Sequence, residues 1–451
     1  MAADSSHKMG LTACIAVVAG NMMGSGIALL PANLAAIGSI TVVGWAVALV
    51  GALALAYVFS RLGMEDPQEG GPIAYSGEVS PVLGYQAGLL YYHANWIGNL
   101  AIAITGVDYL SVFIPALEHP ITAGVTSIAL IWLFTGINIL GAAWIGRLVS
   151  VGVVLLLIPV VLTGTVGWFF FDPAVFQSNW IVGGKPPGQA IMAAVLLCIW
   201  SFIGIESASV NTAVVDNPKR NIPLSTMIGA GLAGLVYILS CTALSGMFPA
   251  SEMAASGAPF SLALGHICAK LPFAGIVSKT VSAVTAFACL ASLGSWMMLV
   301  SQAGNRAAQD GTLPAIFGRR NHKGIPVAGL ILASVMMTVL LVLLMLVSKG
   351  GDTQTLFGEI CDIAVLLTLP PYFYSSLNLL RRYGLNNARA WLQVGSALIA
   401  CVFCLIALAG AAKAALAGCL MVMLCSFVFY VGKDRSIYEQ KAMAQRDGTD
   451  A

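Results

Sequence analysis

Charged residues are scarce in this sequence. They make up 9% of its 451 residues, whereas 59% are hydrophobic and the mean hydropathy is +0.89. Soluble globular chains carry roughly 25% charged residues, because polar side chains must cover a surface that faces water. So low a charge content excludes a soluble enzyme, a nucleic-acid-binding protein and a disordered scaffold. The composition predicts an integral membrane protein.

Patterns that indicate other classes of protein are also missing. The net charge is only +2 and no run of five basic residues is present, which argues against a nucleic-acid partner. The sequence has no HExxH, GxSxG or P-loop motif, so it does not favour an enzyme. The ten cysteines lie mostly in apolar stretches, and even the pair Cys401 and Cys404 is expected to pack. We expect no cofactor and no metal ion.

Twelve apolar stretches are long enough to cross a bilayer, which takes roughly 20 residues. They lie at 10–37, 39–61, 82–115, 121–141, 148–171, 189–213, 223–248, 273–306, 326–348, 356–381, 390–411 and 413–432. The longest segments between them, at 172–188, 249–272 and 307–325, are only loop-sized. The sequence therefore predicts an all-α integral membrane protein with twelve transmembrane helices and no soluble domain.

The distribution of positive charge indicates the orientation. With twelve crossings both termini share one side of the membrane, and that side collects sixteen Lys and Arg residues against five on the other. Cytoplasmic loops carry an excess of Lys and Arg. We therefore expect a multi-pass protein with cytoplasmic tails at 1–9 and 433–451, and we find no clear cleavable signal sequence at its N-terminus.

Unusual features recur five helices apart. The first and sixth stretches are interrupted near their middles, at 20–27 (GNMMGSGI) and 200–207 (WSFIGIES), and the third and eighth are both unusually long. Because five is odd, a second copy would be inverted in the membrane. Inverted repeats with broken helices are typical of secondary transporters, which bind substrate at the breaks. We expect five-helix repeats at 10–171 and 189–381, with helices 11 and 12 at 390–432 outside them.

Glu206 is the acid that lies deepest in an apolar stretch. An acid at the bilayer centre costs about 2.5–3.5 kcal/mol on insertion scales, so it is a candidate functional residue. A carboxylate facing a cavity suits a cationic substrate, a sodium ion or a proton. The alternative is a structural acid paired with a donor on another helix. Asp108, Glu359 and Asp362 lie nearer to helix ends and are weaker candidates.

The two interruptions offer complementary chemistry. The small residues at 24–26 let the backbone leave the helix, and the half-helix that starts near Ile27 would point N–H groups at a carboxylate. The half-helix that ends near Ile203 would point carbonyl groups at an ammonium. Together they match both ends of an amino acid. A small-residue packing face is the alternative interpretation of 24–26.

Amides and aromatic rings lie in the same helices. Asn95 and Asn99 are four residues apart and therefore share one helix face. Trp200, Trp296 and Tyr372 could attract an ammonium group, at about 0.5–2 kcal/mol for each ring. Each of these rings could also belong to packing or to the aromatic belt of the membrane interface, and a proton-coupling role for His93 is left open.

Several motifs resemble one known family. Residues 21–27 (NMMGSGI) with 30–35 (LPANLA), and 200–208 (WSFIGIESA) with 217–220 (NPKR), resemble helices 1 and 6 of the bacterial basic amino-acid/polyamine antiporters. These belong to the amino acid–polyamine–organocation (APC) superfamily. Residues 70–75 (GGPIAY) and 91–99 (YYHANWIGN) are most similar to members that exchange lysine and cadaverine. The similarity runs from about residue 8 to residue 435.

The resemblance implies a fold and an activity. The fold would be LeuT-like, a 5+5 inverted repeat with helices 1 and 6 broken, and the protein would form a homodimer in the bacterial inner membrane. It would exchange external lysine for internal cadaverine, supporting acid resistance together with a cytoplasmic lysine decarboxylase. Ornithine/putrescine or arginine/agmatine exchange is the alternative within the family. A membrane receptor or a channel is the alternative outside it.

The resemblance also implies roles for individual residues. The substrate carboxylate would contact Asn21, Ser25 and Gly26, and its α-ammonium the carbonyl groups near Ile203. The other substrate-binding residues would be Ala94, Asn95, Asn99, Trp200, Trp296 and Ala364. Gating and proton coupling would involve Tyr75, Tyr91, Tyr92, Glu206 and Tyr372. Asn95 and Ala364 stand where arginine/agmatine exchangers have a cysteine and a serine, which makes arginine less favoured than lysine.

Overall fold

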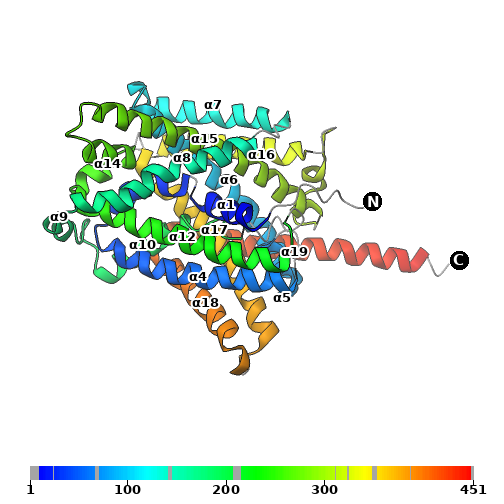
Figure 1. Ribbon diagram of the computed structural model, residues 1–451. Coiled ribbons are helices and arrows are strands. Elements are labelled where there is room, and N and C mark those ends of the chain that lie inside the picture. Colours follow the sequence, from blue (N-terminus) through cyan, green and yellow to red (C-terminus); the bar gives the residue numbers. More distant parts are fainter. Residues whose placement is uncertain are drawn as a thin grey trace.

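The chain is almost entirely helical in the computed structural model (Figure 1). The structure describes residues 10–23, 25–66, 71–140, 145–206, 215–309, 311–321, 325–347, 353–385 and 388–447. Within these ranges there is no β-strand, and one isolated strand-like bridge pairs Arg320 with Pro326. The expectation of an all-α protein is confirmed for this part of the chain.

The helices follow one another with short connections. The first part of the chain forms α1 (Leu11–Met22), α2 (Ser25–Ala28), α3 (Leu30–Ala35), α4 (Thr41–Glu65), α5 (Pro72–Val79), α6 (Pro81–Ser111), η2 (Pro115–Glu118), α7 (Pro120–Ile139), α8 (Ile145–Thr165), η3 (Val166–Phe170) and α9 (Pro173–Ser178). The second part forms α10 (Pro187–Trp200), α12 (Pro218–Met247), α13 (Ala250–Ala254), α14 (Pro259–Ile267), α15 (Ala274–Gln309), η5 (Ala315–Gly318), α16 (Val327–Val347), α17 (Thr353–Tyr383), η6 (Ala388–Ala390), α18 (Trp391–Gly410) and α19 (Lys413–Asp447).

Prolines fix where many of these helices begin. Proline is the first residue of α5, α6, α7, α10 and α12. The first helical residue has no intrahelical partner for its N–H group, so a proline there costs no hydrogen bond, and its fixed φ suits the helix. The helix starts are therefore encoded locally.

Eight helices in the described ranges are long and apolar enough to cross a membrane. They are α4, α7, the 151–170 stretch of α8 and η3, α12, α15, α16, the 357–383 stretch of α17, and α18. They coincide with eight of the twelve expected crossings. A membrane protein with multiple spans is therefore confirmed, while the full number of twelve stays a prediction.

The other four expected crossings are not among these eight long apolar helices. The first is divided among α1, α2 and α3, and the sixth is reduced to α10, which has 14 residues. The third corresponds to α6, which has 31 residues but carries Gln86, His93, Asn95, Asn99 and Asp108. The last corresponds to the apolar 415–431 stretch of α19.

The chain leaves the helical conformation at both interruptions that the sequence indicates. Helix α1 ends at Met22 and α2 begins at Ser25, two residues before the expected start near Ile27. Helix α10 ends at Trp200, three residues before Ile203, and turns follow as far as Glu206. Gly204 has φ +106°, a conformation that favours glycine. The apolar neighbours of Glu206 suggested that it lies inside a helix, but the structure places it in a turn. Residues 207–214 lie outside the described ranges.

Helices α6 and α15 are long, with 31 and 36 residues, and they pack along each other (Figure 1). At about 1.5 Å per residue, both exceed the roughly 30 Å of a bilayer core. Helix α17 packs against α6 as well. These three packed helices therefore lie beside the two interrupted ones.

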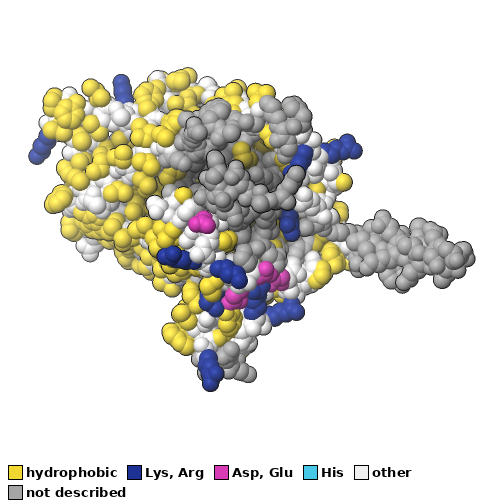
Figure 2. All heavy atoms as spheres, turned by 45° about the vertical axis from the view of Figure 1, so that its right-hand side comes forward, with side chains coloured by type: hydrophobic (Ala, Val, Ile, Leu, Met, Phe, Trp, Pro, Cys, Tyr) yellow, Lys and Arg dark blue, Asp and Glu magenta, His cyan; other side chains and the backbone are white. Residues whose placement is uncertain are grey.

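The outer surface is divided between apolar and charged areas. Figure 2 shows apolar side chains over much of the described surface, with the visible acidic side chains and several basic ones in the lower middle of the view and other basic ones near its edges. Where α4, α5 and α17 end, Arg382 lies 2.5 Å from Glu78 and 3.3 Å from Glu65, and Glu65 lies 2.9 Å from Arg61. This ion-pair cluster ties three helix ends together.

Candidate functional site

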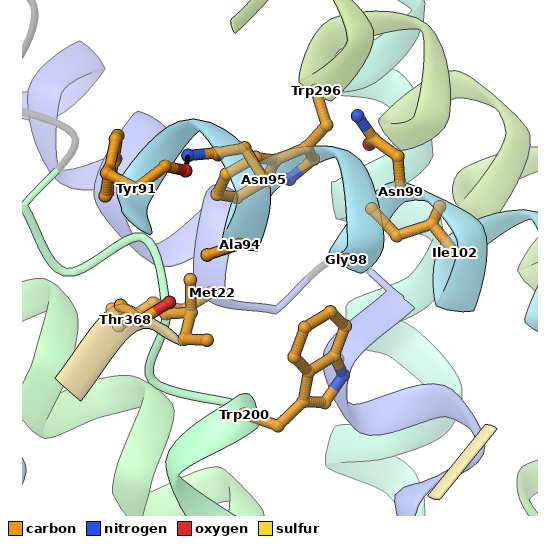
Figure 3. Close-up of a pocket in the computed structure, with 12 residues that line it drawn as sticks. Met22, Tyr91, Ala94, Asn95, Gly98, Asn99, Ile102, Trp200, Trp296 and Thr368 are labelled. Atoms are coloured by element: carbon orange, nitrogen blue, oxygen red, sulfur yellow. Dashed lines mark hydrogen bonds between the residues drawn. The ribbon is translucent and has the colours of Figure 1, made fainter. Parts of the chain in front are cut away.

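A cavity lies where the two interrupted helices meet α6, α15 and α17 (Figure 3). Its lining consists of Met22, Gly26, Tyr91, Ala94, Asn95, Gly98, Asn99, Ile102, Trp200, Ile203, Trp296 and Thr368. None of these twelve side chains is charged, and most are apolar or aromatic. Ligand sites commonly have this character, an apolar enclosure with a few polar groups that fix the orientation of the ligand.

The two interruptions meet at this cavity. The Ser201 hydroxyl donates a hydrogen bond to the Gly26 carbonyl at 3.3 Å. A Cβ atom on Gly26 would lie 3.4 Å from the Cα of Ser201, so the two backbone segments are in contact. Tyr237 donates to the Ser201 carbonyl at 3.2 Å, and Tyr109 donates to the Ala28 carbonyl at 2.7 Å. These hydroxyl groups satisfy backbone carbonyls that the interrupted helices leave without helical partners.

Helix α6 presents one face to the cavity. Ala94, Asn95, Gly98, Asn99 and Ile102 follow each other at helical spacing and all belong to the lining. A Cβ on Gly98 would come within 3.0 Å of the indole ring of Trp200, so glycine at this position lets the ring reach α6. Figure 3 shows Trp200 extending toward this helix from the end of α10.

The two asparagine side chains on this face of α6 differ in their hydrogen bonding. The Asn95 side-chain N–H group donates to the Tyr91 carbonyl at 2.7 Å, one turn earlier. The Asn99 side chain is 1% exposed, yet neither its amide nitrogen nor its amide oxygen has a hydrogen-bond partner in the described part of the chain. A buried polar group without a partner costs roughly 1–3 kcal/mol. Asn99 therefore has both a donor and an acceptor for a ligand.

Glu206 lies beside the cavity and is held by two tyrosines. Tyr91 donates to one carboxylate oxygen at 2.7 Å, while Tyr372 donates to the other at 2.5 Å. The Gly204 N–H group also donates to Glu206, at 3.2 Å. The Glu206 side chain is 1% exposed, and Tyr372 packs edge-on against Phe59 with ring centroids 5.2 Å apart. This cluster connects α6, α17 and the turn after α10.

The structure brings most of the candidate binding residues together. Gly26, Ala94, Asn95, Asn99, Trp200, Ile203 and Trp296 all line the cavity, as does the candidate gate residue Tyr91. Ala364 does not line it. This residue is fully buried in α17, where its carbonyl accepts the Thr368 hydroxyl at 2.8 Å. The side chains of Asn21 and Ser25 lie outside the described part of the structure.

Besides Glu206 and Tyr372, two further candidate gate residues, Tyr92 and Tyr75, lie off the cavity lining. Tyr92 is buried and donates to the Gly329 carbonyl at 3.0 Å, while its ring meets Phe317 edge-on. Tyr75 is buried in α5, where its backbone carbonyl accepts from Asn378 at 3.0 Å. Their roles in gating stay predictions, and neither role is one of direct contact with a ligand in this cavity.

Four lining residues were not identified from the sequence: Met22, Gly98, Ile102 and Thr368. Gly98 and Ile102 could have been found, since they share the helix face that Asn95 and Asn99 define. Thr368 follows Ala364 by one turn and could have been found in the same way. Met22 ends α1 directly before the interruption, a position with no signal of its own.

A solute cavity at the junction of two interrupted helices, inside a membrane-spanning bundle, is the arrangement of a secondary transporter. Comparison with known proteins supports this assignment to a class of transporters. A family profile described as amino acid permease matches residues 9–442, which is nearly the whole chain. The chain belongs to the amino acid permease family, and the family resemblance of its motifs is thereby confirmed.

Individual relatives of this chain include two kinds of transporter. The chain is 54% identical to the cadaverine/lysine antiporter of Escherichia coli (strain K12) over 431 residues, 95% of this chain and 96% of the relative. It is 33% identical to the putrescine transporter PotE of the same strain, over 83% of this chain and 84% of the relative. The putrescine transporter PotE of Haemophilus influenzae is 34% identical over 82% of this chain and 83% of the relative.

Proposed function

We propose that this protein is a secondary active transporter that exchanges external lysine for internal cadaverine across the inner membrane. The observation that carries the proposal is the buried Glu206 carboxylate beside a cavity whose lining contains no basic residue. The identity of 54% with a cadaverine/lysine antiporter over nearly the whole chain favours this pair of substrates.

The cavity suits a cationic substrate with an apolar middle. The Glu206 carboxylate would attract ammonium groups, and the amide oxygens of Asn95 and Asn99 can accept hydrogen bonds from them. Trp200 and Trp296 offer aromatic faces that attract a cation and apolar surface for a five-carbon chain. Lysine and cadaverine share this chain and the distal ammonium, so one cavity can bind both.

The α-carboxylate of lysine requires a separate group of donors. The start of α2, at Ser25 and Gly26, and the side chain of Asn21 would supply them, because N–H groups at a helix start favour an anion. The carbonyl groups near Ile203 would accept hydrogen bonds from the α-ammonium. Cadaverine lacks the carboxylate and would leave the donor group unused, which would allow the decarboxylated product to leave on the other side.

We assign Glu206, Tyr91 and Tyr372 to a gate on the cytoplasmic side of the cavity. Their hydrogen bonds join α6 and α17 to the turn after α10, so opening this side requires them to break. Glu206 would also respond to protonation, which removes an acceptor site and the charge. Tyr75, Tyr92 and Ala364 would act on the gate or on the distal end of the substrate through the helices that carry them.

The proposal includes an arrangement in the membrane. The family resemblance favours twelve helices, two inverted repeats at 10–171 and 189–381, and a homodimer. The distribution of Lys and Arg favours a cytoplasmic location for both termini. Exchange of lysine at +1 for cadaverine at +2 would export one charge per cycle. Together with a cytoplasmic lysine decarboxylase, which consumes a proton, this exchange would support acid resistance.

Putrescine is the competing substrate, because two relatives at 33% and 34% identity are named putrescine transporters. Purified protein in liposomes loaded with cadaverine, putrescine or agmatine distinguishes the candidates. We expect radiolabelled lysine to enter fastest against cadaverine. Faster entry of ornithine against putrescine would replace the proposed pair, and equal entry into empty liposomes would indicate a channel.

A further inference from the structure

Thr368 occupies a distinctive position on α17. It lines the cavity, and it precedes Tyr372 by four residues, so both lie on one face of the helix. Tyr372 donates to Glu206 at 2.5 Å. Thr368 is therefore the lining residue of α17 that lies one turn from the proposed gate.

The hydrogen bond of the Thr368 hydroxyl determines what it can offer a ligand. Its proton is directed to the carbonyl of Ala364 in the preceding turn, at 2.8 Å. A hydroxyl has one proton and two lone pairs, so a hydroxyl bonded in this way presents only acceptor sites to its other neighbours. Toward the cavity, the Thr368 oxygen can receive a hydrogen bond but cannot donate one.

We propose that the Thr368 oxygen accepts a hydrogen bond from a substrate ammonium group at the end of the cavity next to Glu206. This inference rests on the proposed function for the cationic nature of the substrate. An ammonium group has three donors and no acceptor, so it fits an acceptor-only oxygen. A carboxylate has only acceptors and is disfavoured at the same place, which makes Thr368 a specificity-determining residue.

Asn95 supplies a counterpart on another wall of the cavity. One of its side-chain N–H groups is committed to the Tyr91 carbonyl, also one turn earlier in its own helix. Figure 3 shows Asn95 and Thr368 on different walls of the same cavity, carried by α6 and α17. Two oxygens from two packed helices can thus share the donors of one ammonium group, and the bound cation would link the helices that the gate also links.

The test compares two substitutions at the site with one control. Thr368→Val removes the oxygen with little change in shape, while Thr368→Ser keeps it. Thr105→Val is the matched control, because Thr105 is a buried threonine of α6 that bonds the carbonyl of Ala101 at 2.9 Å but does not line the cavity. Cadaverine binding to each purified full-length variant is measured by calorimetry, and the KM and kcat of exchange in liposomes.

We expect Thr368→Val to bind cadaverine about tenfold or more weakly, as for a lost hydrogen bond to a charged group. The KM should rise more than kcat falls, and Thr368→Ser should stay within about threefold of the parent protein, as should Thr105→Val. Equal affinity of Thr368→Val and the parent would overturn the proposal, and so would equal losses in all three variants. If the parent protein neither binds nor exchanges cadaverine, that result refutes the proposed function, and the role of Thr368 that depends on it is refuted as well.

Discussion

The substitution Glu206→Gln tests the gate most sharply. The carboxylate accepts one hydroxyl on each oxygen, from Tyr91 at 2.7 Å and from Tyr372 at 2.5 Å. Glutamine keeps the volume but replaces one oxygen with an N–H₂ group, and it carries no charge. One tyrosine hydroxyl then faces the N–H₂ group and must rotate so that its oxygen accepts from it. The other tyrosine hydroxyl still donates, but to a neutral amide oxygen.

The magnitude follows from the two bonds. A hydrogen bond to a charged group contributes about 1.5–3 kcal/mol and a neutral one about 0.5–1.5 kcal/mol, so each bond loses roughly 1 kcal/mol. Two bonds give about 2 kcal/mol, or about 30-fold in the balance between closed and open gate. Because this gate must close before the cavity can open to the other side, a less stable closed gate should slow exchange. We expect unchanged expression, and a flatter pH dependence because residue 206 no longer titrates.

The assay is lysine/cadaverine exchange in liposomes across a range of pH. Glu206→Asp should retain more activity than Glu206→Gln, since it keeps a titratable group. Tyr372→Phe removes one of the two hydroxyl bonds and should cause a smaller change at unchanged charge. If Glu206→Gln transports at the parental rate with the parental pH profile, Glu206 has only a structural role and the gate assignment is refuted.

Three further substitutions test other parts of the account. Asn95→Ala should weaken binding of both lysine and cadaverine by about 1.5–3 kcal/mol, measured at equilibrium, and unchanged affinity for both would place the distal contact elsewhere. Gly98→Ala adds a Cβ about 3.0 Å from the ring of Trp200, and overpacking of this kind costs about 1–3 kcal/mol, so the KM should rise while a Gly395→Ala control, with open space around it, should not change. Arg382→Gln removes the partly exposed ion pair with Glu78 and should lower stability by at most about 1 kcal/mol, seen as a lower unfolding temperature at low salt that converges with the parent at high salt.

The sequence allowed the main frame of the fold to be predicted because its signals are local. Apolar runs gave eight crossings that the structure contains, and glycines marked the two places where helices stop. The position of Glu206 was harder to predict. Its neighbours are apolar, which is typical of a helix, but Gly204 adopts a left-handed conformation and carries the chain into a turn.

The candidate site was predicted best where helical spacing applies. Asn95 and Asn99 lie on one face of α6, and both line the cavity. Tyr91 and Tyr92 are adjacent, so they point about 100° apart on the helix and only one of them faces the cavity. Thr368 was missed because a threonine in an apolar helix is ordinary, and only its position relative to Glu206 gives it significance.

Exchange itself is the central claim, and counterflow in sealed liposomes measures it directly. Radiolabelled lysine is supplied outside liposomes that contain the purified protein and are either empty or loaded with cadaverine. We predict rapid lysine entry into the loaded liposomes, matched by cadaverine efflux, and almost none into the empty ones. Equal entry into both would contradict obligatory exchange and would require a different function for the cavity beside Glu206.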